Sequence, residues 1–168
     1  MSEMNYDTID TVQYDVLKEI GNIGAGNATT ALSQIINTRI DMEIPVVNLM
    51  ELKELPDLVG GAENILTGIL FRLEGELDGM IMFVMERDSS RHLLNILFQN
   101  NDSTEQDFSE MDCSALKEVG NIIVGAYLSS LSSLTNLLIT TSVPSMAIDM
   151  AGAILSVPAI EFGKLGDK

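Results

Sequence analysis

The stretch LKEIGNI at residues 17–23 recurs as LKEVGNI at residues 116–122, an offset of 99 residues. The same offset aligns residues 10–45 with residues 109–144 without a gap. A match of this length without a shift indicates that a supersecondary unit is duplicated within the chain. Outside the quoted stretch, the offset pairs identical residues at several positions: Gly26 with Gly125, Asn37 with Asn136, and Pro45 with Pro144.

Each copy of the unit is predicted to begin with a long helix. Asp10 followed by Gln13, and Ser109 followed by Asp112, have the spacing of an N-cap and its partner at the third helical position. Apolar residues then recur at helical spacing in both copies. The predicted spans are about 11–36 for the first helix and about 110–135 for the second.

Strand-like runs follow each helix, at residues 39–50 and 137–147. The first copy continues with two further apolar runs, residues 66–73 and 77–85, which predict an antiparallel hairpin with glycine-containing turns. A short helix then carries Leu93, Leu94, Ile96 and Leu97, and the polar segment 99–107 links the two copies.

We expect one domain over residues 1–168, built from two repeats at about 10–100 and 109–168. The second repeat is expected to be shortened at its C-terminal end, since it has no counterpart of the hairpin and closing helix. The composition fits a folded domain, because 46% of the 168 residues are hydrophobic.

The net charge of −16 argues against direct binding to nucleic acid or to an anionic membrane surface. The single cysteine, Cys113, excludes an internal disulfide and a multi-cysteine metal site. No secretory signal and no apolar run long enough to span a membrane is visible. A cytoplasmic protein without membrane insertion is therefore expected.

A polar stripe is predicted on each long helix, because residues at i, i+4 and i+7 share one face. Such a stripe usually does nothing but face water. Two copies of the same Glu and Asn, each followed 23 residues later by a proline (Pro45 and Pro144), favour a function instead. The stripe residues are Asp15, Glu19 and Asn22 in the first copy and Ser114, Glu118 and Asn121 in the second.

Other chemistry in the sequence is sparse. The glycine-rich segment 21–30 differs from a phosphate-binding loop, because no strand precedes it and no Gly-Lys-Ser/Thr ending follows. No histidine- or cysteine-rich metal cluster can be recognised, and no metal site is expected. Cys113, in the first turn of the second helix, is best explained as a small structural residue.

The spacing Asp/Ser-x3-Glu-x2-Asn-x22-Pro, present twice, resembles the signature of the CheC, CheX and FliY family of chemotaxis phosphatases. The resemblance covers nearly the whole chain. It implies an α/β fold of the α+β type, in which a duplicated unit with pseudo-two-fold symmetry forms a mainly antiparallel sheet with two long motif helices packed side by side. It also implies hydrolysis of the aspartyl phosphate of the response regulator CheY.

Within this resemblance the motif residues take distinct roles. Asn22 and Asn121 are expected to orient the attacking water, because a carboxamide is neutral and both donates and accepts hydrogen bonds. Glu19 and Glu118 are expected to dock the lysine of the receiver rather than touch the phosphoryl oxygens, which a carboxylate repels. Magnesium is expected in the bound CheY, so this chain needs no cofactor of its own.

The remaining motif residues are expected to support the site: Asp15, Pro45, Ser114 and Pro144. A second partner, the receptor deamidase CheD, is implied by the family, and Asp149 is the candidate contact. It lies among small residues at 145–153, like the frame around a receptor glutamine that CheD modifies. The alternative function is a non-catalytic module that sequesters or regulates CheD. A small ligand between the helices would rest on the glycines alone.

Overall fold

The computed structural model describes residues 10–100 and 107–166, with side chains as far as Glu161. Most of the predicted linker 99–107 lies outside the described residues. The two predicted long helices are confirmed with the expected bounds, as α1 (Thr11–Ile36) and α4 (Glu110–Thr135). Each begins with the predicted capping box, and each ends at an asparagine in the left-handed conformation, Asn37 and Asn136.

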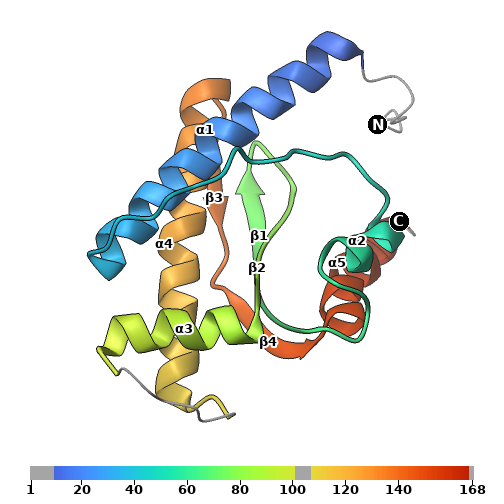
Figure 1. Ribbon diagram of the computed structural model, residues 1–168. Coiled ribbons are helices and arrows are strands. Elements are labelled where there is room, and N and C mark those ends of the chain that lie inside the picture. Colours follow the sequence, from blue (N-terminus) through green and yellow to red (C-terminus); the bar gives the residue numbers. More distant parts are fainter. Residues whose placement is uncertain (1–9, 101–106, 167–168) are drawn as a thin grey trace.

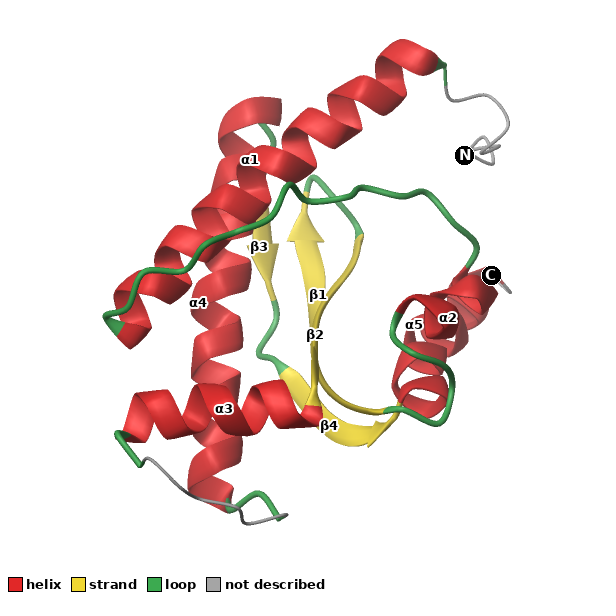
Figure 2. Cartoon of the chain, viewed as in Figure 1, coloured by secondary structure: helices red, strands yellow, loops and turns green. Residues whose placement is uncertain are grey.

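The four strands of the described chain form one antiparallel sheet centred on β1. Its members are β1 (Ile65–Gly75), β2 (Gly79–Glu86), β3 (Ile139–Thr141) and β4 (Ser145–Met150). Strand β2 pairs with one edge of β1, and β3 and β4 share the other edge. The predicted hairpin and the mainly antiparallel α+β fold are therefore confirmed (Figures 1 and 2).

Four further helical segments complete the architecture of the described residues. The predicted short helix forms as α3 (Arg87–Phe98) directly after β2. The sequence did not predict α5 (Ala151–Gly166), which follows β4 and contains Pro158. It lies beside α2 (Leu55–Leu58) and the preceding 3-10 turn η2 (Leu52–Glu54), and α5 and α2 pack on the face of the sheet opposite α4 (Figure 1).

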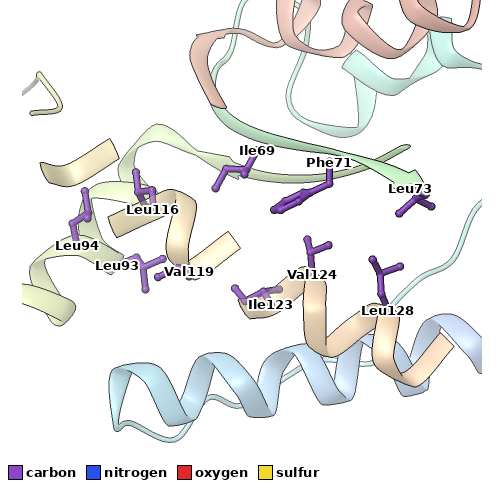
Figure 3. Packing of buried hydrophobic residues seen from close by; sticks show 10 residues of the cluster. All are labelled: Ile69, Phe71, Leu73, Leu93, Leu94, Leu116, Val119, Ile123, Val124 and Leu128. Atoms are coloured by element: carbon purple, nitrogen blue, oxygen red, sulfur yellow. The ribbon is translucent and has the colours of Figure 1, made fainter. Parts of the chain in front are cut away.

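The main core lies between α4 and the face of β1. Figure 3 shows Val124 and Leu128 of α4 facing Phe71 and Leu73 of β1. Ile69 and Phe71 are completely buried, so each removes its full apolar area from water and contributes about 2 kcal/mol. This packing makes α4 the rigid support of the second polar stripe.

Helix α1 packs on α4 rather than on the sheet. Its predicted apolar face is consequently exposed near the N-terminus, where Val12 and Val16 are 70% and 52% exposed. Equivalent residues of the two helices differ in burial accordingly: Leu17 of α1 is 37% exposed, and its counterpart Leu116 of α4 is 0% exposed. The two copies therefore share a helix but have different surroundings.

The strand predicted over residues 39–50 was wrong. Residues 38–51, which we call the strap, form no strand and run back along α1 before crossing to α2 (Figures 1 and 2). A strand needs a partner, and the strap pairs with none of the four strands of the described sheet. The other predicted run, 137–147, forms two strands separated by a short irregular stretch, and β4 continues to Met150.

Candidate functional site

The first polar stripe lies on the N-terminal half of α1. Asp15 and Glu19 are exposed, as the sequence analysis expects, and they lie one turn apart on the helix. Asn22 is only half-buried as a residue, but its Oδ1 atom is fully buried and has no hydrogen-bond partner. Pro45 is half-buried in the strap.

The second polar stripe lies on α4 and is open to solvent. Ser114, Glu118 and Asn121 are all exposed. Pro144 is half-buried and immediately precedes β4. The structure thus places the three polar residues of each stripe on one helix as predicted, while the two asparagines differ in accessibility.

The start of α4 is held by contacts that the sequence analysis did not identify. The Arg91 guanidinium on α3 lies 3.2 Å from the buried carboxylate of Asp112 and donates a 2.6 Å hydrogen bond to the carbonyl of Asp107. It also lies 4.2 Å from the centre of the Phe108 ring. These residues are brought together only when α3 packs beside the start of α4, so no spacing in the sequence indicates the contacts.

The pKa of Asp112 follows from the same contacts. Burial alone raises the pKa of this carboxyl group, because it disfavours the charged form. Hydrogen bonds from the backbone and hydroxyl of Ser109 and from Arg91 outweigh burial, so the pKa lies below its usual value. A charged Asp112 therefore caps α4 and fixes the helix that carries Glu118 and Asn121.

The two motif helices are joined in their middle sections. The Tyr127 ring of α4 rests on Gly24 of α1, where an added methyl group would lie 2.5 Å from the ring. Burial raises the pKa of the Tyr127 hydroxyl, so this side chain stays neutral. The amide of Asn27 donates a hydrogen bond to the hydroxyl of Ser130. These contacts give both stripes one common support. The glycine-rich segment 21–30 lies wholly within α1 and therefore forms helix rather than a loop.

Asp149, the candidate CheD contact, lies in strand β4. It is exposed near the end of β4, and its carboxylate accepts a 2.7 Å hydrogen bond from the backbone of Met150. It lines a hollow of about 780 Å³ together with Lys117 and Cys113 of α4. The hollow therefore extends from the candidate CheD contact to the residue preceding Glu118.

The geometry suits recognition of a protein rather than enclosure of a small substrate. A carboxylate and a carboxamide three residues apart occupy adjacent turns of one exposed helical face. The carboxylate can pair with a cation, and the carboxamide can position a water molecule. Among the described residues no group of three His, Cys, Asp or Glu side chains is placed to hold a metal. No described helix has the length and apolarity to cross a membrane.

Comparison with known proteins identifies the class. A model described as the CheC-like family matches residues 12–49 and 111–148, which contain both motifs. The chain is 39% identical over 164 residues to the CheY-P phosphatase CheC of Bacillus subtilis (strain 168), covering 96% of this chain and 78% of that protein. This protein therefore belongs to the CheC-like family.

Further relatives match this chain at lower identity. The flagellar motor switch phosphatase FliY of Bacillus subtilis (strain 168) is 24% identical over 143 residues, which cover 84% of this chain and 37% of FliY. The crystal structure of Thermotoga maritima FliY superposes with a TM-score of 0.71 at 23% identity, covering 84% of this chain and 70% of that chain. A CheC-like superfamily protein from Shewanella gives a TM-score of 0.56 at 14% identity, covering 79% and 77% of the two chains. These structures share the fold.

Proposed function

We propose that this protein is a phosphatase that hydrolyses the aspartyl phosphate of CheY. One relative is named as a CheY-P phosphatase and another as a flagellar motor switch phosphatase, and both names support a phosphatase activity here. The observation that carries the proposal is the exposed pair Glu118 and Asn121 on a helix that the core holds rigidly. Glu19 presents the same carboxylate in the first copy.

In the proposed reaction Asn121 holds a water molecule in line with the phosphorus of the acyl phosphate. The water oxygen attacks phosphorus, and the bond from phosphorus to the aspartyl oxygen breaks. The aspartate leaves as a carboxylate, and both protons of the water remain with the inorganic phosphate, which forms as dihydrogen phosphate. A neutral carboxamide suits this role because it adds no negative charge beside the phosphoryl oxygens. Holding the water near its attack position lowers the entropic part of the barrier.

In the same proposal Glu118 and Glu19 dock the receiver through its active-site lysine. An ion pair of this kind steers association and fixes orientation. The magnesium ion belongs to CheY and neutralises the phosphoryl charge there. Asp15 and Ser114, one turn before each glutamate, support the docking surface, and Pro45 and Pro144 set the direction of the chain that follows each motif.

The decisive experiment follows the decay of CheY phosphate with and without this protein. The wild type accelerates the decay, and the double variant Asn22→Ala/Asn121→Ala loses the acceleration while it still binds CheY. Gln34→Ala is the matched control, because it removes an exposed amide from α1 outside the motif. A double variant as fast as the wild type rules out the proposed role of the asparagines.

A contact with CheD through Asp149 is the second part of the proposal. Exposure of this carboxylate beside the hollow between β4 and α4 supports it. Binding to CheD is measured by calorimetry for the wild type and Asp149→Ala, with Asp88→Ala as an exposed control on α3. Clear CheD binding without any effect on CheY phosphate favours the alternative of a sequestering module.

A further inference from the structure

The strap contacts α1 directly beside the first motif asparagine. The hydroxyl of Tyr14 on α1 donates a 2.9 Å hydrogen bond to the carbonyl oxygen of Val47 in the strap. The side chain of Val47 reaches the backbone of Gly21, where an added methyl group would lie 2.6 Å from its Cγ2 atom. Gly21 precedes Asn22, so the strap is in contact with the helix at this point.

A second contact lies on the other side of Asn22 along the helix. The hydroxyl of Thr29 donates to the sulfur of Met42 in the strap, at 3.1 Å. Thr29 follows Asn22 by seven residues, which places the two on nearly the same side of α1. The strap therefore contacts α1 on both sides of Asn22, and Figure 1 shows it running along this helix.

Helix α4 lies on the other side of α1. Its contacts are made with Gly24, under the Tyr127 ring, and with Asn27, which bonds to Ser130. These positions are rotated from Asn22 by about 200° and about 140° around the helix axis. Among the described residues, the strap lies on the Asn22 side of α1, where it can cover the buried and unpartnered Oδ1 atom.

The second motif has no such cover. The repeat aligns Tyr14 with Cys113 and Val47 with Met146. Met146 lies in β4 and pairs with Ile69 of β1, so the segment equivalent to the strap belongs to the sheet. Asn121 is exposed as a result.

We propose that the strap is a cover over the first motif, held closed by Tyr14, and that Asn121 carries most of the hydrolysis while the strap is closed. Tyr14 is a positioning residue, since it acts on Asn22 through Val47. The catalytic part of this inference rests on the proposed phosphatase function, whereas the cover itself does not. Loss of the Tyr14 hydroxyl shifts the balance of closed and open strap about fivefold.

The cover is tested without any activity assay. In a Cys113→Ser background, Asn22→Cys and Asn121→Cys each introduce one thiol, and its rate of reaction with a soluble disulfide reagent is measured. The thiol at position 121 reacts much faster than the thiol at position 22, and Tyr14→Phe accelerates only the latter, by about fivefold. Equal rates at the two positions, or no effect of Tyr14→Phe, overturn the cover.

The catalytic part is tested by a gain of activity, which a merely structural defect does not produce. In the Asn121→Ala background, Tyr14→Phe raises the residual acceleration of CheY phosphate decay, and adding Asn22→Ala removes the gain. Val47→Ala, which shortens the side chain against Gly21, acts in the same direction as Tyr14→Phe. Absence of a gain in both variants overturns the inference.

The two proposals fail in distinguishable ways. If the thiol at position 22 is protected but the wild type does not accelerate CheY phosphate decay, the cover stands and the phosphatase function is wrong. If the wild type is active but Asn22→Ala and Asn121→Ala lose equal activity, the phosphatase function stands and the inequality of the motifs is wrong. Circular dichroism of each variant confirms that it is folded.

Discussion

The guanidinium of Arg91 lies 3.2 Å from the carboxylate of Asp112 and thereby joins α3 to the first turn of α4. Both side chains are largely shielded, with exposed fractions of 14% and 13%. Removing one partner leaves the other charge buried and unpaired, which costs more than the pair itself contributes. This contact therefore holds the start of the helix that carries the second motif.

Replacing Arg91 is therefore expected to destabilise the whole domain. Arg91→Ala lowers the free energy of unfolding by about 3 kcal/mol, measured by urea denaturation. The matched control is Arg39→Ala, which breaks an ion pair with Asp41 whose side chains are 89% and 86% exposed. That exposed pair contributes less than about 1 kcal/mol, so equal losses in the two variants contradict the prediction.

Stability is also expected to fall at acid pH through Asp112. Its folded pKa lies below the ordinary value of 3.8, so its contribution is complete above the unfolded pKa. That contribution is lost as the pH falls through the lower folded pKa, because the native state must then take up a proton. Asp112→Asn reduces the acid slope of the free energy of unfolding between about pH 5 and pH 2, and an unchanged slope contradicts this assignment.

Two glycines on α4 are expected to respond in opposite directions to the same change. A methyl group added at Gly120 would lie 2.7 Å from the buried side chain of Ile69, whereas at Gly125 nothing lies within 4 Å. Gly120→Ala lowers stability by about 1–3 kcal/mol, because it overpacks the core. Gly125→Ala raises stability by up to about 1 kcal/mol, because alanine is the better helix former. Thermal unfolding of both variants tests the pair, and destabilisation by Gly125→Ala contradicts the geometry.

The motif glutamates are expected to act in docking rather than in chemistry. Glu118→Gln weakens binding to phosphorylated CheY about tenfold, since the charged partner of the receiver lysine is lost. At saturating protein the rate of phosphate loss falls much less than the affinity. Glu74→Gln is the control, because this glutamate is exposed on β1, outside both motifs. Equal affinity of Glu118→Gln and the wild type removes the docking role.

Sequence alone predicted the elements that depend on local signals. The capping residues Asp10 and Ser109 begin α1 and α4 where predicted, because a cap and its third-position partner lie in one turn. The hairpin was predicted for a similar reason, since glycines separate two apolar runs. Local patterns also placed Glu118 and Asn121 correctly on one exposed face.

Elements that depend on distant partners were not predicted. The strap has the alternation and the β-branched residues of a strand, but a strand forms only by pairing with another strand, and the strap runs along α1 instead (Figure 1). The burial of Asn22 Oδ1 was not predicted either, because spacing along one helix does not show what the rest of the chain places beside it. Helix α5 was missed because an apolar segment of mixed periodicity with an internal Pro158 does not indicate a helix.

The glycine shared by the two motifs, Gly21 and Gly120, meets an irregular segment in one copy and the sheet in the other. A backbone position without a side chain accepts either neighbour at the same close range, so an identical helical sequence suits two unlike environments. The two halves of the molecule can therefore differ in function while the sequence of the duplicated helix stays the same around this glycine.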